Sequence, residues 1–282
     1  MGYNSTFFLN RKPNPPLSRI YTDAMALECI KCIKNMRCMV LFPTATKYKK
    51  EDVIENYINS YGVLYYDKSV KLNINGVNNL IKELYREEEW IGGMFPRGFS
   101  PGGKAERCIT DDKEQNIKIY LFYMRDLDKL VELKEKCRDI YNIGKHSLHI
   151  SDFTKDTFRI ASSLLNENSI HFLNNGTNDI SENTKKLLID YFNKLDENNI
   201  DEDYCLTSSL IMEIFGLRAA KDIDYLQKDN INLNLKDVRI HDGIWEKYYG
   251  IHKDEIIYNP NNHFYFNGYK FATLEIIKNM KI

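Results

Sequence analysis

Residues 207–226 read TSSLIMEIFGLRAAKDIDYL, and this stretch decides the fold of the C-terminal part of the chain. It begins where a short strand is expected to turn into a helix, at three hydroxyl residues: Thr207, Ser208 and Ser209. It ends in a second predicted strand, 222–227, which contains Asp222 and Asp224. Because residues two apart on a strand point to the same face, we expect these two carboxylates side by side.

Two neighbouring carboxylates repel each other unless a cation lies between them. Hard oxygen ligands of this kind select Mg²⁺ or Mn²⁺. The N–H groups at the start of a helix, together with small hydroxyls, suit a phosphate group. Metal-binding carboxylates beside a phosphate site predict phosphoryl or nucleotidyl transfer. The alternative is that both aspartates are solvated residues of an exposed strand.

Further from this stretch, strands and helices alternate, which predicts an α/β (α+β) protein. The spacing of apolar residues predicts helices over 23–34, 51–60, 77–89, 126–141, 154–165, 181–195, 208–215 and 274–280. Strands are expected at 38–42, 62–73, 117–124, 169–173, 203–206, 222–227, 263–266 and 269–272. The last two flank Asn267-Gly268, which favours a two-residue hairpin turn.

The polar, turn-rich segment 174–182 predicts a domain boundary. We therefore expect an N-terminal arm (1–18), an α/β domain of unassigned role (19–175) and a mixed-sheet domain (176–282).

The 282 residues carry 39 Lys and Arg against 40 Asp and Glu, a formal net charge of -1. This balance argues against bulk nucleic-acid binding. No apolar run approaches the ~20 residues of a membrane span, and we identify no secretory signal. We therefore expect a cytoplasmic protein with reduced cysteines. Cys29-x-x-Cys32 has no second metal-binding pair, so both cysteines are expected in a core.

The stretch 207–226 is similar to the nucleotidyltransferase-fold superfamily (polymerase-β-like), and most to the branch that includes AbiEii-type toxins. That branch has two glycines and a Ser or Thr, a helix, then Gly-x-Arg and Asp-Ile-Asp-aromatic. Without a gap, Thr207 and Ser208 fall on the glycines and Ser209 on the hydroxyl residue. Further matches are Gly216, Arg218, Asp222, Ile223, Asp224 and Tyr225. The segment 268–281 (GYKFATLEIIKNMK) resembles the branch's last strand and helix.

The resemblance implies a nucleotidyltransferase-fold domain that binds Mg²⁺ or Mn²⁺ and moves a nucleotidyl group from an NTP to an acceptor. The balanced net charge favours a small-molecule or glycan-precursor acceptor over a nucleic acid. It implies catalytic roles for Asp222, Asp224 and Lys281, with the first two as metal ligands. Phosphate binding would fall to Thr207, Ser208, Ser209 and Arg218. Members of the superfamily take a third acid from a neighbouring strand, and Asp237 and Asp242 are the candidates here, with His241 beside them.

The chain also loosely resembles bacterial surface-polysaccharide biosynthesis proteins that carry this module, in its stretches FYFNGYKF and KHSLHISD. One alternative is therefore a sugar- or phosphotransferase that uses a nucleotide-activated donor. The other is a catalytically inactive binding module, because two glycines of the pattern are replaced.

The N-terminal half offers a possible acceptor or second site. A glycine-rich loop, 92–104, contains Lys104 and is either a loop that closes on an anion or a structural loop. Lys145, His146 and His149 lie close together in KHSLHISD, where they could bind phosphate or transfer a proton. The alternation of that segment predicts a strand with Ser147, His149 and Ser151 on an exposed face.

Overall fold

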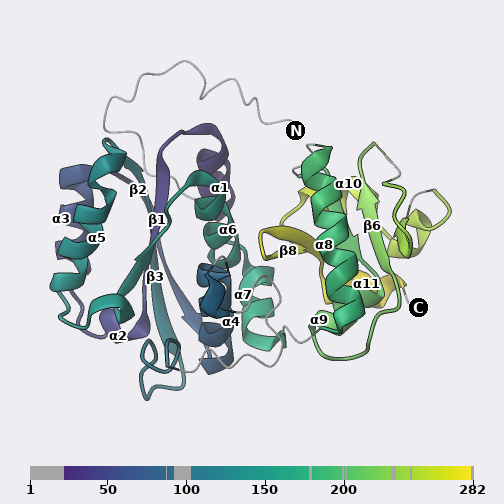
Figure 1. Ribbon diagram of the computed structural model, residues 1–282. Coiled ribbons are helices and arrows are strands. Elements are labelled where there is room, and N and C mark those ends of the chain that lie inside the picture. The colour runs from purple at the N-terminus through teal and green to yellow at the C-terminus, as the bar shows by residue number, and fades with distance from the viewer. Residues whose placement is uncertain are drawn as a thin grey trace. The chain divides into compact units, whose positions relative to one another are not determined.

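The computed structural model forms two compact units, and each is described here by itself. One comprises Met1–Lys71 with Arg107–Ala161, and the other Leu72–Glu106 with Ser162–Ile282. The structure describes residues 22–86, 88–91, 103–177, 180–198, 200, 202–229, 233–241 and 243–280 (Figure 1).

The first unit contains a four-stranded sheet in the order β2-β3-β1-β4. Its strands are β1 (Met36–Leu41), β2 (Gly62–Leu72), β3 (Gln115–Met124) and β4 (Leu148–Ile150). β1 is antiparallel to both β3 and β4, with Met39 opposite Tyr120 and Val40 opposite His149. With α3 (Glu51–Tyr61) after β1 and α5 (Leu130–Asp139) after β3, the order is that of a split β-α-β unit.

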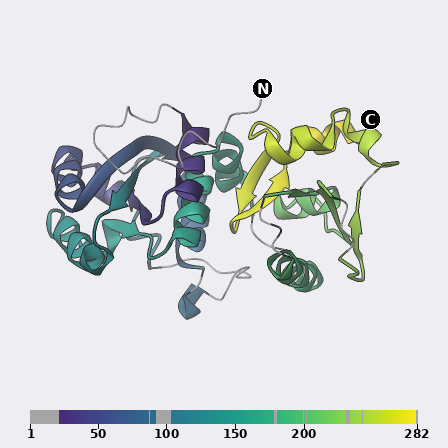
Figure 2. The same ribbon diagram turned by 90° about the horizontal axis from the view of Figure 1, so that it is seen from above.

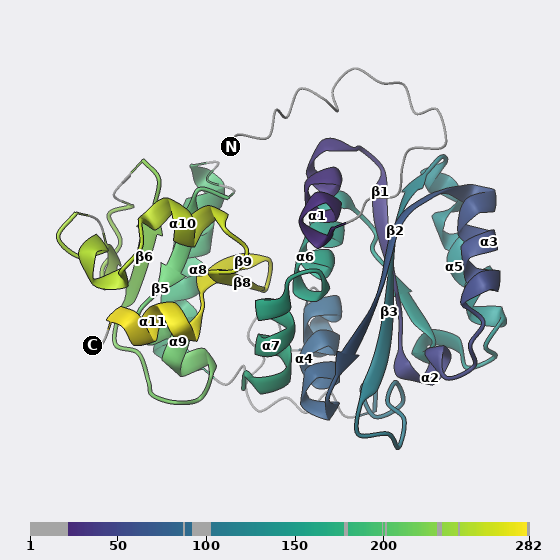
Figure 3. The same ribbon diagram turned by 180° about the vertical axis from the view of Figure 1, so that it is seen from behind.

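Two helix layers cover this sheet, α3 and α5 on one face and α1 (Asp23–Cys32) and α6 (Thr154–Leu164) on the other (Figures 1 and 3). Alternate residues of β1 explain this arrangement, because Met39 and Leu41 join the core under α3 and α5. On the opposite face, Thr157 of α6 donates a hydrogen bond to Met36 O at 3.1 Å. Short helical turns connect these layers: α2 (Pro43–Thr46), η3 (Leu127–Lys129) and η4 (Gly144–His146).

The second unit contains a five-stranded mixed sheet in the order β7-β6-β5-β9-β8. Its strands are β5 (Tyr204–Thr207), β6 (Ile223–Gln227), β7 (Val238–Ile240), β8 (His263–Phe266) and β9 (Tyr269–Ala272). β5 is antiparallel to β6 and parallel to β9, and β6 is parallel to β7. Its helices are α4 (Ile74–Tyr85), η2 (Glu89–Ile91), α7 (Glu167–Asn175), α8 (Glu182–Glu197), α9 (Ser209–Ile214), η5 (Glu246–Tyr249), α10 (Lys253–Tyr258) and α11 (Leu274–Met280).

Helix α8 covers one face of this sheet (Figure 2). Its buried Tyr191 ring lies 5.0 Å from the Tyr225 ring of β6 and 6.0 Å from the Tyr204 ring of β5. Thr207 and Asp224 are paired with each other across β5 and β6. Each lies an odd number of residues from the tyrosine of its own strand, so its side chain points to the opposite face of the sheet. Their side chains therefore lie on the face turned away from α8.

Helices α4 and α7 connect the early part of the chain to the last hairpin of this unit. Asn79 of α4 donates hydrogen bonds to Leu173 O at 2.8 Å and to Gly176 O at 2.9 Å. The buried Glu83 accepts a hydrogen bond from Asn267 N at 3.0 Å, in the turn between β8 and β9. Phe172 of α7 lies in the core of the unit, with its ring 4.8 Å from that of Phe264.

The α/β class predicted from the sequence is confirmed, and so is the hairpin on either side of Asn267-Gly268. The strand expected at 169–173 is wrong, because these residues lie in α7. Asn166 caps that helix by accepting a hydrogen bond from Ser169 N. Contacts also assign residues 162–175 and 72–106 to the second unit, whereas the division expected from sequence groups them with the first.

Two expectations about exposure are also wrong. Ser147, His149 and Ser151 are buried, and α6 covers the last two, with Asp156 facing His149 and Thr157 bonded to Ser151. Cys29 is buried as predicted, but Cys32, at the end of α1, is exposed. All six cysteines are free. Among the described residues, no helix combines the length and the apolar character needed to cross a membrane.

Candidate functional site

The site is centred on the turn between β5 and α9. Ser208 occupies this turn with φ 60° and ψ -137°, a conformation that glycine adopts readily and a residue with a Cβ rarely does. Its Oγ lies 3.5 Å from Met280 Sδ of α11. The short helix predicted over 208–215 is present as α9, which has six residues.

The two aspartates lie as predicted at the start of β6. Asp224 pairs with Thr207 of β5, and both side chains are buried. Asp222 lies two residues earlier, just before the strand, and its side chain is 28% exposed. One carboxylate is therefore accessible to solvent while the other is held in the protein.

Strand β7 and the residue that follows it supply a cationic or hydrogen-bonding partner to each aspartate. Arg239 Nη1 lies 3.4 Å from Asp222 Oδ2, and its side chain is 67% exposed. His241 Nε2 lies 3.1 Å from Asp224 Oδ1, and His241 Nδ1 lies 2.7 Å from Tyr249 Oη. An imidazole with its proton on Nε2 donates to Asp224 and accepts from Tyr249, which satisfies both ring nitrogens.

Tyr249 and Thr207 enclose the inner end of this network. Burial raises the pKa of the Tyr249 phenol, and the nearby Thr207 and Ser208 hydroxyls oppose that rise. The Thr207 hydroxyl is buried and forms no well-aligned hydrogen bond in the part of the chain that the structure describes. Tyr249 therefore stays protonated and serves as a hydrogen-bond donor to His241.

The loop that leads into Asp222 is held by a buried carboxylate on α9. Glu213 accepts hydrogen bonds from Ser181 N (2.7 Å), Thr184 Oγ1 (2.8 Å) and Ala220 N (2.7 Å). Gly216 turns the chain after α9 with φ 72°, and a Cβ there would come within 2.7 Å of Thr177. These contacts connect the start of α8 to the loop before β6.

The two aspartates suit a divalent cation as oxygen ligands, but a third ligand is missing from the described set. Within the described ranges, no three His, Cys, Asp or Glu side chains gather closely enough to hold a metal ion. Asp237 is exposed, has φ 59°, and its carbonyl accepts a hydrogen bond from Ile223 N. Asp242 and Lys281 lie outside the described residues. Arg218 is exposed on the loop before β6, whereas Ser209, the first residue of α9, is buried.

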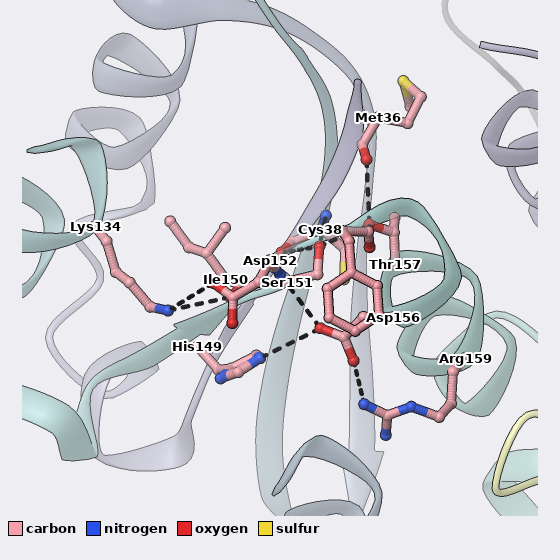
Figure 4. A network of polar contacts seen from close by, with 11 residues as sticks. Met36, Cys38, Lys134, His149, Ile150, Ser151, Asp152, Asp156, Thr157 and Arg159 are labelled. Atoms are coloured by element: carbon pink, nitrogen blue, oxygen red, sulfur yellow. Dashed lines mark hydrogen bonds and ion pairs between the residues drawn. The ribbon is translucent and has the colours of Figure 1, made fainter. Parts of the chain in front are cut away.

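The predicted second site falls mostly in the first unit. Lys145 and His146 lie on η4, while His149 lies inside on β4. Figure 4 shows Asp156 between His149 and Arg159, with His149 Nε2 4.0 Å from Asp156 Oδ2. Of the glycine-rich loop, residues 92–102 lie outside the described residues. Lys104, in the second unit, has its Nζ 5.1 Å from the centre of the Tyr85 ring.

The pKa directions around His149 indicate a buried structural network. Burial lowers the pKa of His149, although Asp156 opposes this. Burial would raise the pKa of Asp156, but its contacts with His149 and Arg159 lower it overall. Lys134 of α5 approaches Ile150 O at 3.3 Å and Asp152 Oδ1 at 3.6 Å (Figure 4). These groups connect α5, β4 and α6, so His149 faces protein rather than a substrate.

Sequence reasoning missed Arg239 and the bridging position of His241. The available signal was the alternation in VRIH, residues 238–241, which puts Arg239 and His241 on one face of a strand. Comparisons with known proteins do not assign the chain to a family, because no family model and no curated protein matches it.

Proposed function

We propose that the chain is a metal-dependent nucleotidyltransferase that moves a nucleotidyl group from an NTP to a hydroxyl of a small-molecule or glycan-precursor acceptor. The observation that carries the proposal is the position of Asp222 and Asp224, on one face of the sheet beside the Thr207–Ser208 turn. The resemblance of 207–226 to the nucleotidyltransferase pattern supports the same assignment.

Asp222 and Asp224 would hold Mg²⁺ or Mn²⁺, which supplies charge neutralisation at the phosphates when bound. The exposed guanidinium groups of Arg239 and Arg218 can bind phosphate oxygens, since arginine presents several N–H donors in one plane. His241 and Tyr249 fix the orientation of the Asp224 carboxylate. Lys281 remains a further candidate for charge neutralisation.

The test is nucleotide binding by calorimetry and turnover with the four NTPs, with and without Mg²⁺ or Mn²⁺. We expect metal-dependent binding that falls at least about 100-fold in Asp222→Asn and Asp224→Asn, because each change removes one charged ligand. Asp190→Asn, at an exposed position of α8, is the matched control and is expected to bind as the wild type does. Released pyrophosphate identifies the NTP reaction, while a released nucleotide identifies a nucleotide-activated donor.

A catalytically inactive binding module is the second candidate, and one observation favours it. Each aspartate already has a partner, Arg239 of β7 for Asp222 and His241, directly after β7, for Asp224. A module of this kind needs no divalent cation at the aspartates. Nucleotide binding that is unaffected by metal and by both Asp→Asn variants would support this candidate and contradict the enzyme.

A further inference from the structure

Large apolar side chains are exposed directly after β7, next to the aspartate pair. The exposed fractions are 74% for Ile244, 48% for Trp245 and 46% for Tyr248. A single exposed apolar residue is ordinary, but three within five positions form a local patch. The patch, Ile244–Tyr248, begins three residues after His241.

The Trp245 ring has a fixed orientation relative to this site. It stacks on the His241 imidazole, with the ring centres 5.2 Å apart and the planes 15° from parallel. His241 is itself held by Asp224 and by Tyr249, which is fully buried. A flat ligand that stacked on Trp245 would therefore meet a preorganised surface and lose little affinity to side-chain ordering.

Cations lie around this aromatic surface. Arg239 of β7, two residues before His241, has a 67% exposed side chain. Lys247 Nζ lies 5.1 Å from the centre of the Tyr248 ring. An aromatic surface next to exposed cations complements a ligand that combines a flat ring with phosphate groups, and the two carboxylates would suit the divalent cation that accompanies such phosphates.

From this arrangement we infer that Trp245 is the stacking platform for the base of a nucleoside triphosphate. The inference rests on the proposed function, because the phosphates would be bound by the divalent cation that Asp222 and Asp224 would hold and by Arg239. His241 connects the two parts, since it stacks on Trp245 and contacts Asp224. In a nucleotide, the ribose similarly connects the base to the α-phosphate. Stacking on one ring recognises the π-face of any base, so the platform adds affinity for all four NTPs.

Intrinsic fluorescence tests the platform directly, because the chain has only two tryptophans, Trp90 and Trp245. In Trp90→Phe, Trp245 is the sole tryptophan emitter. We expect each NTP with Mg²⁺ to quench this emission at the concentrations at which calorimetry shows binding. Inorganic tripolyphosphate, which has no base, should bind without quenching.

Substitutions then separate the contribution of the base to binding from that of the phosphates. Trp245→Ala should weaken NTP binding roughly 5- to 150-fold and leave tripolyphosphate binding unchanged, as expected for the loss of one stacked base. Trp245→Phe should recover part of the loss. Trp90→Ala, which also removes an exposed tryptophan, is the matched control and should bind NTPs normally.

The outcomes distinguish a failure of the platform from a failure of the proposed function. NTP binding that depends on Asp222 but neither quenches Trp245 nor weakens in a folded Trp245→Ala overturns the platform alone. Quenching by neutral sugars without quenching by NTPs also overturns it, because the ring would then serve a glycan. If neither NTPs nor tripolyphosphate bind with Mg²⁺, both the platform and the proposed function are overturned.

Discussion

Ser208 carries a backbone cost that its position in the site helps to explain. Its φ of 60° and ψ of -137° lie in a region where a Cβ is crowded, and such residues concentrate at functional sites. The turn connects the end of β5 to α9 beside Asp224, so straightening it would move the Thr207 and Ser208 backbone relative to the carboxylate. A glycine would hold the same turn without the crowding.

Replacing Ser208 by glycine is therefore expected to stabilise the second unit. The gain should be about 1 kcal/mol, because the relief of strain exceeds the extra flexibility of glycine in the unfolded chain. Thermal unfolding should show it as a rise of roughly 2–4 °C in Tm. Ser209→Gly is the control, since Ser209 lies in α9 and a helical glycine costs roughly 0.5–1 kcal/mol. Equal Tm changes in the two variants would contradict the strain argument.

At the residue scale, the sequence alone predicts that Asp222 and Asp224 share a face, because side chains alternate along any strand. The sequence alone does not predict which residues contact the two aspartates. Which residues of β7 meet the aspartates depends on the parallel pairing of β6 with β7, in which Asp224 lies opposite Arg239. That register is set by tertiary packing, so His241 could be named from sequence only as a neighbour of Asp237 and Asp242.

At the scale of elements, β4 and α6 pack against each other around buried charged groups. His149 pairs with Val40 in the sheet and faces Asp156 of α6. Ser151 and Thr157 join the same two elements through hydroxyls 2.7 Å apart. Charged groups around His149 are Asp156 on α6, Lys134 on α5 and Asp152 in the connecting loop. The protonation of His149 therefore affects how well these elements pack.

This arrangement predicts that acid destabilises the first unit. The pKa of His149 is lowered on folding, so the unfolded state binds the proton more tightly and stability falls as pH drops below about 6.5. The lowered pKa of Asp156 acts in the same direction below about pH 4. Chemical unfolding between pH 7.5 and 5.5 should show a loss of up to about 1.4 kcal/mol per pH unit below 6.5.

His149→Gln removes the titrating group and should flatten this pH dependence. His171→Gln, at an exposed histidine of α7, is the control and should keep the slope of the wild type. An unchanged slope in His149→Gln would show that other groups cause the acid sensitivity. Titration of the His149 ring by NMR gives a separate check, with a midpoint expected below 6.5.

Most elements could be predicted because their signals are local, and α7 shows where this fails. The run SIHFL, residues 169–173, has the short apolar and aromatic character of a strand. Asn166 followed by Glu167 is the competing signal, because these residue types favour the start of a helix. In the structure the Asn166 side chain caps the helix by accepting a hydrogen bond from Ser169 N. Phe172 and Leu173 then lie buried on one side of the helix. Capping and packing decided the conformation against the β-propensity of the run.

At the scale of the whole molecule, the chain passes between the two units at residues 71–72, 106–107 and 161–162. Nothing in the sequence marks the first crossing, because Leu72 ends a continuous strand, β2. The polar segment 174–182 was the visible boundary signal, yet α7 before it packs in the core of the second unit. Boundaries set by contacts between distant segments are not visible in local composition.

The division by contacts predicts which fragments of the second unit fold. A fragment of residues 176–282 lacks Phe172, whose ring contacts Phe215, Phe264 and Phe266. Loss of a buried phenylalanine costs about 3–5 kcal/mol, which is much of the stability of a domain. We expect 176–282 to lack a cooperative thermal transition, and 162–282 to show a weak one. Joining 72–106 to 162–282 by a flexible Gly/Ser linker should raise Tm further, because α4 restores Asn79 and Glu83.

Substitutions in the full-length chain provide the control for this ranking of fragment stabilities. Phe172→Ala should lower the free energy of unfolding of the second unit by about 3–5 kcal/mol. Phe153→Ala, at a side chain that is 53% exposed, should change stability by less than about 0.5 kcal/mol. If 176–282 unfolds cooperatively with the same Tm as the linked fragment, α4 and α7 are dispensable for the second unit. The boundary at 174–182 would then be the correct one, and the aspartate site could be studied on the short fragment alone.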